Sequence, residues 1–211
     1  MNSQRFAKPT SPYQVHFHDE NAVELLAKQF FLYLKQKYFM DLVIICIGTD
    51  RSTGDALGPL VGSKLKNLLP EHVPLYGTLE QPVHAINLQE TMTHIHQKHI
   101  LPCFIAIDAC LGQPENIGKI TIAEGPLKPG AGVQKDLPEI GHLHITGVVN
   151  VGGFMEYLVL QNTRLHVVMS IADVIASFLY LGITQWSSAL FEKQNLHGDK
   201  QGIFSQPKQE S

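Results

Sequence analysis

Short apolar runs alternate along this chain with segments in which apolar residues recur every three or four positions. The runs 42–47 and 104–107 contain no polar residue, which is typical of parallel strands covered on both faces. The other predicted strands are 73–79, 118–123, 142–149 and 165–171. Amphipathic helices are predicted at 19–38, 55–69, 83–96, 152–161 and 172–193.

The alternation of strands and helices predicts an α/β fold of three layers, with a mainly parallel twisted sheet and helices on both faces. With 211 residues and 44% hydrophobic content, the chain suits one domain, which we place at residues 19–194. Residues 1–18 and 195–211 lack apolar periodicity, so we expect two loose tails.

The loop 48–59 follows the first apolar strand and is far more polar than a connecting turn requires. It carries Asp50, Arg51 and Asp55. A second carboxylate, Asp108, ends the apolar strand 102–108. Open α/β sheets bind ligands beyond the carboxyl ends of their strands, where the strand order reverses. With a strand order of the 2-1-3 type, Asp55 and Asp108 become neighbours.

The loop has two other possible roles, phosphate binding and helix capping. A phosphate-binding loop is disfavoured, because no Gly-Lys-Ser/Thr or Gly-x-Gly-x-x-Gly pattern occurs and the carboxylates of Asp50 and Asp55 would repel a phosphate. Asp55 as a simple helix cap stays open. Asp108 follows five residues without a polar side chain and needs a pocket or a partner, because burying an unpaired charge is costly.

Neighbouring carboxylates share a proton at neutral pH and can act as acid and base on an attacking water, which suits amide hydrolysis. Asp55 and Asp108 are therefore the predicted catalytic residues, and no cofactor is expected. A divalent metal between them stays an alternative. We expect substrate contacts from Thr49, Asp50, Arg51 and Thr53 of the loop, and His144 is a further candidate because it follows the Gly-rich segment 125–141.

The composition of the chain argues against some classes of binding partner. The formal charge of −3 and the scattered Lys and Arg residues argue against nucleic acid. Cys46, Cys103 and Cys110 have no zinc-ligand spacing and suit reduced core thiols, so a cytoplasmic protein without a membrane span is expected. The remaining histidine pairs have poor spacing for metal binding. The Phe- and Leu-rich faces of the first and last helices suit core or dimer surface, so a homo-oligomer stays open.

Three motifs together resemble a known family. They are Asp55-Ala56-Leu57-Gly58-Pro59, Ile107-Asp108-Ala109 and Lys128-Pro129-Gly130-Ala131-Gly132-Val133. In order and spacing they resemble the YyaC-type sporulation proteins of endospore-forming Firmicutes over roughly residues 20–190. These are similar in turn to the spore germination protease and, more distantly, to the hydrogenase maturation endopeptidases.

The resemblance implies a phosphorylase/hydrolase-like fold and an endopeptidase of sporulation or germination, acting in the cytoplasm of the mother cell or forespore. The germination protease uses two aspartates, which match Asp55 and Asp108, on small acid-soluble spore proteins. In the maturation enzymes an acidic pair with a histidine binds the nickel of the immature subunit, and Asp55 stands where those enzymes usually have Glu. The alternatives are a non-catalytic peptide-binding protein that regulates sporulation and a metal-sensing peptidase of the maturation type.

Overall fold

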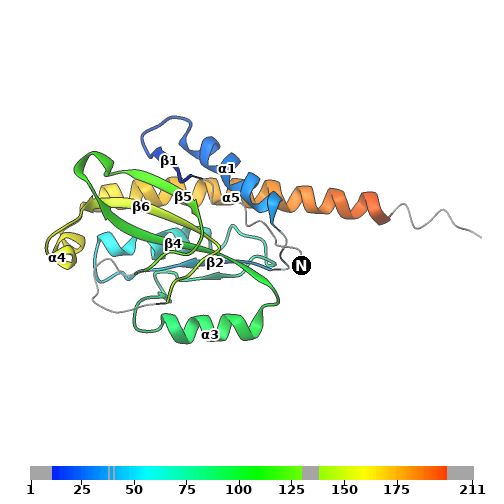
Figure 1. Ribbon diagram of the computed structural model, residues 1–211, viewed down its shortest axis with the longest axis horizontal. Coiled ribbons are helices and arrows are strands. Elements are labelled where there is room, and N and C mark those ends of the chain that lie inside the picture. The colour runs from blue at the N-terminus through cyan, green and yellow to red at the C-terminus, as the bar shows by residue number, and fades with distance from the viewer. Residues whose placement is uncertain (1–10, 38, 40, 130–137, 199–211) are drawn as a thin grey trace, which may run out of the picture.

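The computed structural model describes residues 11–37, 39, 41–129 and 138–198, with the backbone alone for 191–198 (Figure 1). In this part of the chain, six strands form one sheet in the order β1-β5-β6-β4-β2-β3. The strands are β1 Tyr13–His16, β2 Asp41–Cys46, β3 Leu75–Tyr76, β4 Pro102–Gly112, β5 Lys119–Glu124 and β6 Leu143–Val151. The pairs β3·β2, β2·β4 and β4·β6 are parallel, whereas β5 and β1 pair antiparallel at the far edge.

Helices cover both faces of the sheet. They are α1 Ala22–Gln36, α2 Leu57–Leu65, α3 Leu88–Lys98, α4 Glu156–Gln161 and α5 Leu165–Gly198, with short 3-10 turns η1 Gly54–Ala56 and η2 Pro114–Asn116. The buried faces of α1, α2 and α5 share one core with the sheet, and α3 packs on the opposite face (Figure 1). The predicted α/β fold of three layers with a mainly parallel sheet is confirmed.

The central strands divide their side chains between two cores. In β2, Ile44 and Cys46 pack with α1 and α5, whereas Val43 and Ile45 pack with α3. The strand β4 follows the same period of two, which is why both sequences are apolar without alternation. By this alternation, Asp108 belongs to the same face of the sheet as the β4 residues that pack with α3. It lies at the carboxyl end of the sheet.

Two predicted elements are wrong. Residues 165–171 are not a strand but the first turns of α5, because a short apolar run does not distinguish a strand from the start of a buried helix. The helix predicted at 83–96 begins only at Leu88. The preceding residues form a loop in which Val83 makes a parallel bridge to Ile47, and Ile86 is 80% exposed.

The two predicted tails are wrong where the structure describes part of them. Residues 13–16 form β1 and pair with β5, so the tail assignment is wrong there; the alternation of four residues was too short a signal. Residues 195–198 continue α5. Residues 1–10 and 199–211 lie outside the described residues.

The last helix, α5, contains a longer apolar stretch than expected from the sequence. Residues 165–190 of α5 are long and apolar enough to cross a membrane by length and composition, although no such run was expected. Half of the most apolar window is buried inside the protein, and its buried residues belong to the same core as α1 and α2. The apolar character of α5 thus has a structural explanation as the central helix of one layer.

Candidate functional site

A cavity of about 220 Å³ lies at the carboxyl ends of β2 and β4, and both predicted aspartates line it. The two strands are neighbours. At their carboxyl ends, ahead of the two aspartates in the chain, the Ile47 N–H donates to the Ile107 carbonyl oxygen at 2.7 Å. The predicted 2-1-3 order is present as β3-β2-β4. Much of the remaining wall is apolar, formed by Ile47, Gly48, Ala85, Ile86, Pro129, Tyr157 and Leu160.

A tight turn after β2 presents Asp55. Gly48 has φ +139°, and a Cβ at this position would collide with the carbonyl oxygen of Asp55, so the turn requires glycine. The Thr49 N–H donates to that oxygen at 3.1 Å. Asp55 lies inside the turn η1, and the residue before α2 is Ala56, so Asp55 does not cap that helix. The capping interpretation is therefore wrong.

Burial raises the pKa of the Asp55 carboxyl above its ordinary value of 3.8; a hydrogen bond from the Thr49 backbone and the charge of His84 oppose this rise. A raised pKa marks a carboxyl whose charged form the fold disfavours. Such a group is suited to hold a proton in an acid–base pair.

The raised pKa makes a prediction for stability. As pH rises from 3.8 through the folded pKa, the folded protein binds more protons than the unfolded chain, so Asp55 lowers the free energy of unfolding. Asp55→Asn should therefore raise the urea midpoint at pH 7, and the gain should shrink as pH falls towards 3.8. The exposed neighbour Asp50 provides the control, since Asp50→Asn should show no such trend. A gain that does not depend on pH would contradict the assignment.

Asp108 is 5% exposed, and its Oδ1 accepts the backbone N–H of Ala109 at 2.7 Å. In register it lies beside Thr146 of β6, and the pairing of the two strands shifts between Cys110 and Leu111. Irregularities of this kind re-aim side chains and are frequent next to active sites. The carboxylate is thus held by a rigid central strand rather than by a loop.

Two further residues of the cavity, His84 and Ser52, were not predicted. His84 lies in the segment that was assigned to a helix. Its Nδ1 accepts the Ile86 N–H at 3.3 Å, so the neutral ring carries its proton on Nε2. Ser52 is 8% exposed, and its hydroxyl has no hydrogen-bond partner among the residues described. A buried hydroxyl without a partner is unusual, and it leaves a place for a water molecule or a ligand atom.

The other predicted contact residues divide into two groups. Thr49 and Arg51 line the cavity, whereas Asp50, Thr53 and His144 do not. His144 lies beside Ala106 in the sheet, with Nδ1 at 2.9 Å from the Gly125 carbonyl oxygen. Of the third sequence motif, Pro129 lines the cavity and residues 130–133 lie outside the described residues.

Cys110 does not have the properties of a nucleophile. Burial raises the pKa of its thiol to about 11, with the charge of Asp108 adding to the rise and a hydrogen bond with Thr146 opposing it. A thiol with this pKa is protonated at neutral pH and a poor nucleophile.

The described residues that line the cavity do not form a metal-binding cluster. Among the residues described, no three His, Cys, Asp or Glu side chains are placed to hold one ion. Asp55, Asp108 and His84 line one cavity, but their arrangement offers no ready-made ligand set. Metal independence stays a prediction, which the chelator experiment below tests.

Comparison with a solved structure shows the fold. The crystal structure of the [NiFe] hydrogenase maturation protease HycI from Thermococcus kodakarensis KOD1 superimposes with a TM-score of 0.51 over 76% of this chain and 99% of that one. The two sequences are 18% identical. The phosphorylase/hydrolase-like and maturation-protease-like fold expected from the motifs is therefore present.

Comparison with sequences shows the family. The chain is 59% identical over 146 residues to a Bacillus subtilis (strain 168) protein named "Uncharacterized protein YyaC", covering 69% of this chain and 71% of that one. The resemblance to YyaC-type proteins is confirmed. The model of the family described as "Protein of unknown function (DUF1256)" matches residues 14–178, which include both aspartates of the cavity, and the chain belongs to this family.

Proposed function

We propose that this protein is an endopeptidase of sporulation or germination, in which Asp55 and Asp108 activate water to cleave a peptide bond in a small protein. The observation that carries the proposal is the presence of both carboxylates in one cavity at the carboxyl edge of the sheet. The maturation-protease fold supports it at the level of a peptidase-like architecture. The sporulation context and the cytoplasm of mother cell or forespore follow from the family resemblance.

The environments of the two carboxyls support distinct roles for them in this proposal. The shared proton is placed on Asp55, whose pKa is raised by burial. Asp108, whose Oδ1 accepts the Ala109 N–H, acts as the base that takes a proton from water. The water oxygen attacks the scissile carbonyl carbon, Asp55 donates its proton to the departing amine, and Asp108 retains the proton from water. Transfer of that proton from Asp108 to Asp55 restores the starting state of the pair.

His84 and Ser52 complete the site. His84 lines the cavity with Asp55, and its neutral ring would donate the Nε2–H to negative charge that develops there. The Ser52 hydroxyl would donate to the peptide oxygen, which gives this buried group the partner that it lacks among the described residues. Arg51 and Thr49 lie at the same cavity and would contact the backbone of the substrate.

The proposal is tested with a recombinant small acid-soluble spore protein as substrate, followed by mass spectrometry. We expect defined fragments from the parent protein, and the same fragments in the presence of a chelator, because the described residues present no metal-ligand set. Binding without fragments would favour a non-catalytic peptide-binding protein. Loss of cleavage in chelator, restored by a divalent ion, would favour a metal-dependent peptidase.

A further inference from the structure

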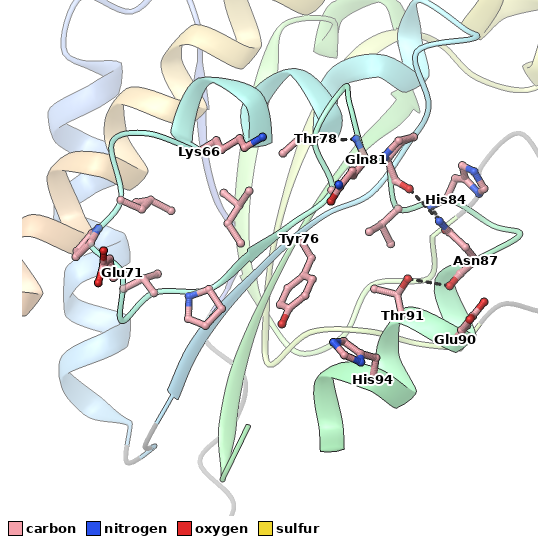
Figure 2. A pocket seen from close by; sticks show the side chains of 18 residues that line it. Lys66, Glu71, Tyr76, Thr78, Gln81, His84, Asn87, Glu90, Thr91 and His94 are labelled. Atoms are coloured by element: carbon pink, nitrogen blue, oxygen red, sulfur yellow. Dashed lines mark hydrogen bonds between the residues drawn. The ribbon is translucent and has the colours of Figure 1, made fainter. Parts of the chain in front are cut away.

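A groove of about 840 Å³ lies next to the candidate site, between the edge strand β3 and the helix α3 (Figure 2). Figure 2 shows Tyr76 on the strand side, with Asn87, Thr91 and His94 on the helix side. His84 lines both this groove and the cavity that contains the aspartates. The two hollows therefore adjoin at His84.

The strand side of the groove has an open backbone edge. Among the residues that the structure describes, strand β3 is the last strand of the sheet, and its only strand partner there is β2. The Ile44 N–H donates to the Pro74 carbonyl oxygen at 2.9 Å, and Ile44 lies opposite Leu75 in register. In a parallel ladder this pattern directs the N–H and C=O of Leu75 away from β2, towards the free edge. Exposed groups of this kind are a template for an added strand.

The charges of the groove favour a neutral or basic guest. Two of its lining carboxylates, Glu71 and Glu90, have no ion pair in the part of the chain that the structure describes. The lining cation Lys66 is already paired, with its Nζ at 2.8 Å from Glu80. A segment carrying Lys or Arg would complement this lining, whereas an acidic segment would be repelled.

We propose that the groove binds an extended, neutral or basic segment of a polypeptide as an added strand beside β3, and that this segment leads the chain past His84 to Asp55 and Asp108. The identity of the guest as substrate rests on the proposed function, but the inference itself concerns binding. Backbone hydrogen bonds to Leu75 supply affinity, and the wall formed by α3 selects the side chains.

A matched pair of threonines on α3 tests the groove. Thr91 lines it, whereas Thr93 is exposed and does not. Both hydroxyls donate to a carbonyl one turn back at 2.9 Å, Thr91 to Asn87 and Thr93 to Gln89, so Thr91→Trp and Thr93→Trp remove the same kind of hydrogen bond from α3. Only a tryptophan at position 91 fills the groove.

The probe is a fluorescent pool of synthetic, Lys- and Arg-bearing peptides about ten residues long, the upper length of common strands. Binding is measured by anisotropy on Asp108→Asn, which prevents turnover. Thr91→Trp in this background should weaken binding at least about tenfold, and Thr93→Trp should leave it unchanged. Hydrogen exchange should show protection of the Leu75 amide when peptide is bound.

Absence of binding, equal affinities for the two tryptophan variants, or an unprotected Leu75 amide would overturn the inference. These outcomes separate it from the proposed function. If both tryptophan variants cleave the spore protein at equal rates, the groove does not bind the substrate, but the proposed peptidase activity stands. Peptide binding that depends on Thr91, without cleavage by the parent protein, would support the groove and refute the peptidase.

Discussion

Asp108→Asn is expected to lower kcat/KM for cleavage of a spore protein by about a thousandfold, since positioned acid–base groups contribute roughly 10²–10⁴-fold. The amide keeps the size of the side chain but cannot accept the proton of the attacking water. Asp55→Asn should lower kcat/KM to a similar extent, because it removes the proton donor. The double variant should be little worse than either single variant, since the two carboxyls act as one unit.

The control for these variants lies in the same loop. Asp50 is exposed and does not line the cavity, so Asp50→Asn should keep kcat/KM within about threefold of the parent, a difference below 1 kcal/mol. Circular dichroism and urea midpoints should show all variants folded, with Asp55→Asn more stable than the parent at pH 7. Unchanged cleavage by either Asp55→Asn or Asp108→Asn in a folded protein would refute the proposed chemistry.

Gly58→Ala is expected to cost about 3 kcal/mol of unfolding free energy, the upper part of the usual range for overpacking. A Cβ at this position would collide with the carbonyl oxygen of Ile47 and lie 2.7 Å from its nitrogen. Both are backbone atoms of the chain leaving β2, so α2 must move away from the strand. Because η1 directly precedes α2, the displacement should also move Asp55 and reduce activity. Urea denaturation measures the first effect.

Gly182→Ala in α5 provides the comparison. The nearest atom to its Cβ would be Cδ1 of Phe30 at 2.7 Å, which belongs to a side chain and not to the backbone. Alanine also gains about 1 kcal/mol of helix propensity over glycine. The net change should therefore lie within about 1 kcal/mol. If Gly58→Ala proves no more destabilising than Gly182→Ala, the close packing of α2 against β2 does not fix the site.

The central architecture was predictable because two strands carry strong local signals. The runs containing Val43 and Ile105 are apolar at every position, which is typical of a strand buried on both faces. Each run ends at polar residues, so the rule for parallel sheets placed Asp55 and Asp108 together without knowledge of side-chain contacts. Both line the observed cavity.

His84 could not be found by the same reasoning, because apolar spacing extended the predicted helix over it. The structure begins α3 at Leu88, after Asn87, whose side-chain oxygen accepts the His84 N–H at 2.8 Å. Asn before an apolar-periodic segment is a helix-start signal, so the boundary was available in the sequence. The bridge between Val83 and Ile47 was not, because it depends on contacts distant in the chain.

The start of α5 shows a further limit. The segment from Leu165 is apolar and has no glycine or proline to separate a strand from a helix. Its helical state follows from packing against α1 and α2, which local pattern does not report. Ser52 is similar: its place in the loop was visible, but the lack of a hydrogen-bond partner among the described residues is a property of the folded chain.

The most direct test of the central claim is cleavage of a small acid-soluble spore protein in water enriched in ¹⁸O, read by mass spectrometry of both fragments and the intact enzyme. The account predicts one ¹⁸O atom in the new carboxyl terminus and no covalent adduct on the enzyme, because water held by Asp55 and Asp108 attacks the peptide directly. An uncut substrate, or an enzyme trapped as an acyl adduct at Ser52 or Cys110, would contradict it.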